Sequence, residues 1–170
     1  MPTLQWSDNF ELDLPAMDDT HREFVDLLAA VEAAPDDTLL ARWAELVEHT
    51  DAHFGREDGW MQATRFASSN CHSMQHKIVL QVMREGLARG QAGEFAVVRQ
   101  MAAELAVWFA HHADAMDAAL ALHLRRVGFD PATGLMTRPD ALPAELIHGC
   151  GGTSCSEPAT SAEPAAETTA

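Results

Sequence analysis

Seven residues of this sequence combine metal-binding side chains with spacings that place them on common helix faces. His53 precedes Glu57 by four positions and His72 precedes His76 by four, so each pair lies on one face of a helix about a turn apart. Five imidazoles and two carboxylates exceed the four ligands of a tetrahedral zinc, but they suit a pair of six-coordinate ions inside a helix bundle. The sequence therefore predicts a dinuclear site. Its candidate ligands are His21, His53, Glu57, His72, His76, His112 and Asp117.

The number of donor atoms predicts an open coordination position. If both carboxylates bridge the two ions and one oxygen atom is shared between them, a single position is left for a small ligand. Each of the seven residues also sits on or beside the apolar stripe of its segment, where an unpaired polar group costs about 1 to 3 kcal/mol. One histidine on a core face is usually a hydrogen-bonded core residue. That interpretation does not account for all seven together.

The spacing between His112 and Asp117 is five residues, which differs from the other pairs. On a helix of 3.6 residues per turn, this spacing rotates the second side chain by roughly 140° from the first. We therefore expect the Asp117 carboxylate to reach sideways and bridge two metals.

Four amphipathic segments carry these residues. Apolar side chains recur at alternating steps of four and three between capping residues, prolines and glycines. The expected helices cover about 19–34, 36–64, the stretch from a cap at 68–70 to Gly90, and the stretch from Gly93 to Gly128. Short connections and the lack of any period-two pattern indicate an all-α, antiparallel up-down four-helix bundle.

The two ends of the chain differ from the helical part. The first segment, up to Met17, holds Trp6 and Phe10 among polar residues and predicts an extended arm packed on something larger. Residues 131–170 are rich in Pro, Ala, Gly, Ser, Thr and Glu, which predicts a low-complexity, disordered tail after a bundle domain of residues 1–130.

The three cysteines do not suggest a disulfide framework. A chain that can bury a core does not need one, so free thiols are expected. Cys71 lies beside His72 and is interpreted as a residue at the edge of the core. Cys150 and Cys155 lie in the tail, where the alternatives are inert thiols, a reversible disulfide or a soft-metal site.

The composition excludes several classes of partner. The 170 residues are 47% hydrophobic, which suits one domain with a proper core. A net charge of -15 disfavours nucleic acid and anionic membranes as partners.

The N-terminal segment carries acids where a secretory signal carries bases, and no apolar run approaches the roughly 18 residues that span a bilayer. The expected location is the cytoplasm.

The sequence resembles the hemerythrin family, and within it the single-domain bacterial members. The resemblance spans about residues 6–126, with all seven ligand positions filled. The stretches that carry it are residues 17–24 (MDDTHREF), residues 53–57 (HFGRE) with Met61, the pair His72 and His76, and residues 108–112 (WFAHH) through Asp117.

The resemblance implies a non-haem di-iron centre with an oxo or hydroxo bridge and dioxygen as its ligand. By this resemblance, one iron is bound by His72, His76 and His112, the other by His21 and His53, and both are bridged by Glu57 and Asp117. The two-histidine iron carries the open position, where dioxygen binds to the diferrous form, takes two electrons and a proton, and leaves again as dioxygen. The implied oxygen pocket contains Phe54, Val79, Trp108, Phe109 and Ala113.

Two positions of that pocket depart from the family pattern. Val79 stands where the family commonly has Phe, and Ala113 stands where it commonly has Ile. A looser wall admits water and anions more readily, so the sequence predicts faster oxidation to the inactive diferric form.

Other histidines are not assigned to metal. His111 points about 100° away from its neighbour His112, and His49 matches no family ligand. His123 lies farther along the last helix. His148 ends a lone Glu-x-x-His motif in the tail, and we attribute that motif to chance.

The leading functional hypothesis is a non-enzymatic protein that binds dioxygen for storage, delivery or buffering. The ligand set favours binding because di-iron enzymes of the ferritin-like type use Glu-rich sets with paired Glu-x-x-His motifs. One alternative is an oxygen or redox sensor read by a protein partner through the tail. Others are a di-iron enzyme acting on peroxide or nitric oxide, and a structural metal site. The sequence does not define the oligomeric state.

Overall fold

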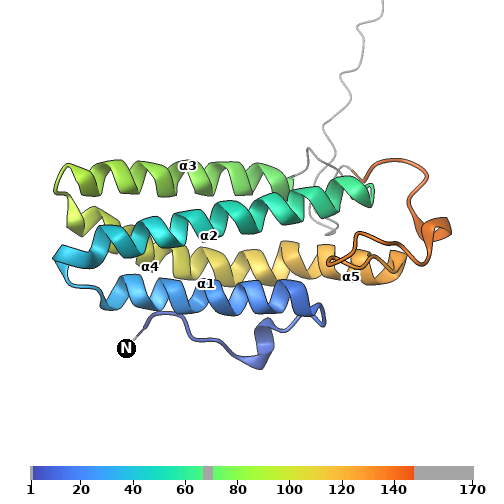
Figure 1. Ribbon diagram of the computed structural model, residues 1–170, viewed down its shortest axis with the longest axis horizontal. Helices are drawn as coiled ribbons and strands as arrows, with labels where there is room; N and C mark the ends of the chain where they lie inside the picture. Colours follow the sequence, from blue (N-terminus) through green and yellow to red (C-terminus); the bar gives the residue numbers. More distant parts are fainter. Residues whose placement is uncertain (1, 67–70, 148–170) are drawn as a thin grey trace, which may run out of the picture.

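The computed structural model describes residues 2–66 and 71–147, and its helices run roughly parallel to one long axis (Figure 1). Short connections at residues 34–35 and 92–94 reverse the chain between long helices. The elements, in chain order, are η1 (Asp8–Phe10), α1 (Pro15–Ala33), α2 (Asp36–Ala63), α3 (Cys71–Gln91), α4 (Phe95–His112), η2 (Ala113–Asp117), α5 (Ala118–Val127) and η3 (Pro139–Ala141).

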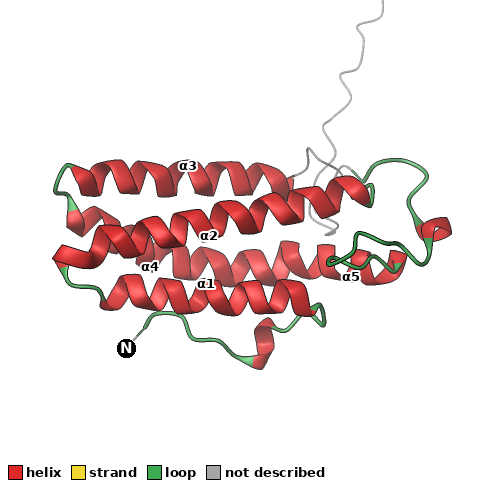
Figure 2. Ribbon diagram, in the orientation of Figure 1, coloured by secondary structure: helices red, strands yellow, loops and turns green. Residues whose placement is uncertain are grey.

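The helices close into a ring. α1 packs on α2, α2 on α3, α3 on α4, and α4 returns to pack on α1. α4, η2 and α5 follow one another without a break, so they act as the fourth helix of the bundle. Figure 2 shows helices and loops within the described residues and no strand there. An isolated antiparallel bridge joins Phe129 and Met136. The predicted all-α bundle is confirmed.

The first long helix begins one turn earlier than expected. α1 starts at Pro15 rather than Asp19, because proline is well suited to the first helical position. The Asp18 carboxylate accepts hydrogen bonds from the backbone N–H groups of Leu12 and Leu14, at 2.8 and 3.1 Å. These bonds fix the turn that leads into the helix.

Two apolar clusters form the core. One surrounds Trp43, Phe24 and Phe109, and the Trp43 indole N–H donates to the Met83 carbonyl at 2.9 Å. The other surrounds Met61 and Leu120. On α2 and on the fourth helix, the predicted ligands occupy the positions between the two clusters. The apolar packing therefore holds a buried polar layer in the middle of the bundle.

The N-terminal arm packs on the bundle as predicted. Phe10 lies 5.8 Å from Trp6 and 5.8 Å from Phe109, measured between ring centroids. The Arg22 guanidinium covers the Trp6 ring at 4.7 Å. The arm thus extends the apolar cluster around Phe109.

The segment after residue 130 differs from the expected disordered tail over its first part. Residues 131–147 fold back on the end of the bundle, because Met136, Leu142 and Ile147 pack against the cluster around Leu120. The Ile147 N–H also donates to the Arg65 carbonyl at 3.1 Å. Residues 148–170 and the expected cap at 68–70 lie outside the described residues. Nowhere in the described part does a helix have both the length and the apolar character needed to cross a membrane.

Candidate metal centre

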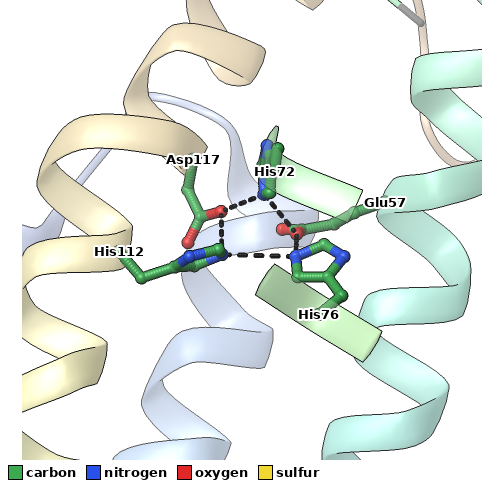
Figure 3. Close-up of side chains that lie close together, drawn as sticks. All are labelled: Glu57, His72, His76, His112 and Asp117. Carbon is green, nitrogen blue, oxygen red and sulfur yellow. Dashed lines mark hydrogen bonds and ion pairs between the residues drawn. The ribbon is translucent and has the colours of Figure 1, made fainter. Parts of the chain in front are cut away.

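All seven predicted ligands lie buried in one polar layer. His21 comes from α1, His53 and Glu57 from α2, His72 and His76 from α3, His112 from α4 and Asp117 from η2. None is more than 3% exposed. Figure 3 shows five of them, Glu57, His72, His76, His112 and Asp117, pointing toward a common centre. Helices that are distant in sequence thus bring these side chains together as the sequence predicted.

The two carboxylates divide the histidines into two groups. Glu57 Oε1 lies 2.9 Å from His53 Nε2, and Glu57 Oε2 lies 3.3 Å from His76 Nε2 and 3.5 Å from His72 Nε2. Each carboxylate oxygen therefore faces a different group.

Asp117 is divided in the same way. Its Oδ2 lies 3.2 Å from His21 Nε2, and its Oδ1 lies 3.0 Å from His72 Nε2 and 3.2 Å from His112 Nε2. One group thus has three imidazoles and the other has two, His21 and His53, whose rings are 5.0 Å apart. Both carboxylates have the geometry of bridges between the groups.

The donor atoms crowd together without satisfying one another. Apart from one Glu32 oxygen, every buried side-chain nitrogen or oxygen among the described residues that lacks a hydrogen-bond partner belongs to the candidate ligands. Such orphaned atoms are costly to bury, and cations placed between them would satisfy them together. The residues present therefore fit a pair of metal ions. The orphaned atoms belong to His21, His53, Glu57, His72 and Asp117.

A π-helical turn explains how Asp117 reaches the site. η2 spans Ala113–Asp117 and adds one residue to the helical turn, as π-bulges at functional sites commonly do. The wider turn compensates for the five-residue spacing from His112. We expected a sideways reach from a regular helix, whereas the backbone itself turns the carboxylate inward.

The carboxylates and histidines of the site shift one another's pKa values. Burial raises the pKa of the Asp117 carboxyl, but His112, His21 and His72 outweigh it and hold that pKa well below its usual range. Burial and the Asp117 charge raise the pKa of Glu57, but His53 and His72 outweigh them and hold that pKa well below its usual range. Burial lowers the pKa of His72, but Asp117 and Glu57 raise it to about 10. The pKa values of His21 and His76 are also raised by neighbouring carboxylates against the effect of burial.

Two residues that the sequence did not single out contact the outer nitrogens of candidate ligands. Asp58 Oδ1 lies 3.1 Å from His76 Nδ1. Gln75 Oε1 accepts from Trp108 Nε1 at 3.3 Å and lies 3.3 Å from His112 Nδ1. Each is the sequence neighbour of a predicted ligand. A ligating histidine commonly uses its outer nitrogen for a hydrogen bond, so polar residues next to the predicted ligands were the signal that could have pointed to Asp58 and Gln75.

We expect Asp58→Asn to weaken metal binding at the three-histidine group. The amide replaces a charged acceptor of the His76 N–H by a neutral one, and losses of this kind cost roughly 10- to 100-fold in metal affinity. Competition with a chelator of known affinity measures the effect. Asp51→Asn is the matched control, because Asp51 lies on the same helix in an exposed ion pair with Arg84. Equal affinities of both variants would rule out this role of Asp58.

Aromatic rings cover the histidines. Phe54 stacks on His76 at 3.9 Å and Trp108 stacks on His112 at 4.4 Å. Phe109 meets His21 edge-on at 5.2 Å. Ala113 is buried beside His112. Val79 lines a cavity of about 180 Å³ between α3 and α4, together with Trp108.

The remaining histidines lie outside both groups. His49 Nε2 lies 3.2 Å from the Thr20 carbonyl, and His123 Nε2 lies 2.9 Å from the Thr64 carbonyl. His111 is exposed on α4. His148 lies outside the described residues.

The cysteine prediction needs one correction. Cys71 takes part in a disulfide bond, so the expectation of free thiols is wrong for this residue. The sequence could not reveal the pairing, because spacing along the chain does not define which sulfurs meet. Cys150 and Cys155 lie beyond the described residues.

Comparisons with known proteins agree with this geometry. Residues 12–122 match the family model described as the hemerythrin HHE cation binding domain, and this range contains all seven candidate ligands. A bacteriohemerythrin of Ralstonia nicotianae is 36% identical over 130 residues, which cover 76% of this chain and 95% of that protein.

More distant relatives carry the same name. A bacteriohemerythrin of Stenotrophomonas maltophilia is 26% identical over 127 residues, which cover 71% of this chain and 81% of that protein. One of Pseudomonas aeruginosa is 28% identical over 98 residues, or 55% of this chain and 64% of that protein. No solved structure gives a significant match.

Proposed function

Because this chain belongs to the hemerythrin family, we propose that its bundle binds dioxygen reversibly at a bridged pair of non-haem iron ions. The observation that carries the proposal is the division of Glu57 and Asp117 between a group of three histidines and a group of two. A non-enzymatic role is consistent with the family.

We assign the ligands from these contacts. His72, His76 and His112 would hold one iron and His21 and His53 the other, with Glu57 and Asp117 between the two groups. The group with one imidazole fewer has the free position. The chemistry that such an iron pair would supply is the reversible transfer of two electrons to dioxygen.

Side chains of the bundle surround both histidine groups. The rings of Phe54 and Phe109 exclude water from the imidazoles, and a dry site limits side reactions. Asp58 and Gln75 hold the outer nitrogens of His76 and His112 and thereby fix the orientation of both rings.

The proposal is tested by following the visible spectrum of the iron-loaded, reduced protein while oxygen is added and withdrawn. We expect a colour that returns over repeated cycles. A colourless protein, or one that binds a single zinc, would contradict the proposal. Turnover of peroxide or nitric oxide with a reductant, above that of free iron, would favour the enzymatic alternative instead.

We further expect Ala113→Ile to slow the irreversible loss of the oxygen-dependent colour by about threefold or more, a barrier change of roughly 0.7 kcal/mol. The larger side chain fills the wall beside His112. Ala113→Val provides a smaller addition in case isoleucine overpacks the core. Val107→Ile is the control, because Val107 lies on α4 with 57% of its surface exposed. If both Ala113 variants lose the oxygen-dependent colour as fast as the unmodified chain or faster, the small side chain at Ala113 is not the cause of the oxidation.

A further inference from the structure

Arginines gather without carboxylate partners where α5 ends. Among the other described arginines, Arg56 and Arg65 donate to oxygens of Thr20 and Pro143. The remaining five form ion pairs with carboxylates: Arg22, Arg42, Arg84, Arg89 and Arg99. Within residues 2–66 and 71–147, Arg125, Arg126 and Arg138 form none, although the chain carries a net charge of -15. A cluster of unpaired cations on so acidic a chain favours an anion as its partner.

Two of these arginines also have a structural role. Arg125 donates to the Leu12 carbonyl and Arg138 donates to the Arg125 carbonyl. These bonds tie the N-terminal arm and the segment after α5 to the helix end. Arg126 forms no hydrogen bond within the described part of the chain, so its guanidinium is available to a ligand.

A cavity lies beside this cluster. Its volume is about 610 Å³, within the range of small-molecule sites. Arg125, Arg126 and Arg138 line it on one side, while Phe66, Leu122 and Ile147 provide apolar surface. A second cavity of about 440 Å³ shares Arg126 and Ile147, and its lining includes Asp140.

The floor of the cavity is fixed. His123 lines it and is held by its contact with the Thr64 carbonyl at 2.9 Å. The Phe66 ring lies 4.9 Å from the His123 ring. Leu122, by contrast, leaves 61% of its surface exposed, so a ligand with a hydrocarbon part would gain by covering it.

We propose that this cavity binds an amphiphilic carboxylate, with its head group on Arg126 and its hydrocarbon chain on Leu122 and Ile147. The planar guanidinium fork matches the two oxygens of a carboxylate. Asp117 and Arg126 are nine residues apart on nearly continuous helix, or roughly 13 Å along the axis. The site is therefore separate from the metal centre and goes beyond the proposed oxygen function.

The test is the binding of octanoate to the full, iron-loaded chain, measured by calorimetry. We expect a dissociation constant below about 1 mM, and at least tenfold weaker binding of octanamide and of inorganic phosphate. Arg126→Gln and Leu122→Asn should each weaken octanoate binding at least tenfold, because both side chains are exposed and contribute to opposite ends of the ligand. The visible spectrum of each variant reports that the bundle is intact.

Arg42→Gln is the matched control, because Arg42 is an exposed arginine already paired with Glu45 on α2. It should bind octanoate as the unmodified chain does. No octanoate binding would overturn the proposal, and so would equal binding of octanamide or of phosphate. Arg126→Gln binding octanoate unchanged would also overturn it.

Discussion

Asp117→Asn is expected to abolish the binding of two metal ions per chain. The substitution keeps the shape of the side chain but removes the charge that lies 3.0 to 3.2 Å from three histidines. Loss of a hydrogen-bond partner of a metal ligand lowers metal affinity roughly 10- to 100-fold. Because Asp117 contacts both histidine groups directly, its substitution should lower the affinity of both metal positions by more than that. Metal content after desalting, measured by plasma emission, should fall from two ions to one or none.

A matched control lies in the same π-helical turn. Asp114 is exposed on η2, so Asp114→Asn removes the same charge without touching the site and should retain two ions. Helical circular dichroism shows whether each variant is folded. Two tightly bound metals in folded Asp117→Asn would mean that this carboxylate is not a bridge.

The second large effect is expected on thermal stability. At a metal concentration a thousandfold above the dissociation constant, binding adds about 4 kcal/mol, which corresponds to a rise in melting temperature on the order of 10 °C for a chain of this size. Chelation should therefore lower the melting temperature markedly. The buried, orphaned donor atoms are the physical reason.

The difference in melting temperature between the metal-loaded and the metal-free protein should grow with pH. In the metal-free protein the contribution of protonated His72 is fully present below its ordinary pKa of 6.5 and is lost as pH rises through about 10. The contributions of Glu57 and Asp117, whose pKa values are lowered, are present above about 4.5 and lost in acid. Bound metal keeps the imidazoles neutral, so the loaded protein lacks the alkaline loss.

Melting temperatures with and without chelator, measured from pH 5 to pH 10, test this expectation. His111→Gln is the control, because His111 is exposed and lies outside both ligand groups. It should reproduce the unmodified curves. A gap that stays constant or narrows between pH 6.5 and pH 10 would show that the histidine protons do not stabilise the metal-free site.

The cluster of candidate ligands could be predicted from the sequence because chelation imposes spacing. His53 with Glu57 and His72 with His76 lie on single helix faces, and the structure brings both pairs into one layer. The π-helical turn before Asp117 could not be predicted, since it depends on how α4 and α5 pack against their neighbours. Periodicity along one segment does not contain that information.

The contacts around the candidate ligands and those of residues 131–147 could not be predicted from the sequence either. Asp58 and Gln75 act through side-chain geometry that adjacency alone does not define. Residues 131–147 have a composition typical of a tail, yet a few apolar side chains such as Ile147 are enough to pack them on the bundle. Such sparse apolar residues give no periodic pattern, so the prediction for this segment followed its composition alone.

The most direct test is the amount of dioxygen that the reduced, iron-loaded protein takes up and gives back. Two irons bridged by Glu57 and Asp117, with a single free position, predict one dioxygen per two irons, fully released under vacuum and bound again afterwards. Uptake that is irreversible, or one metal ion per chain, would contradict the bridged pair as an oxygen-binding centre.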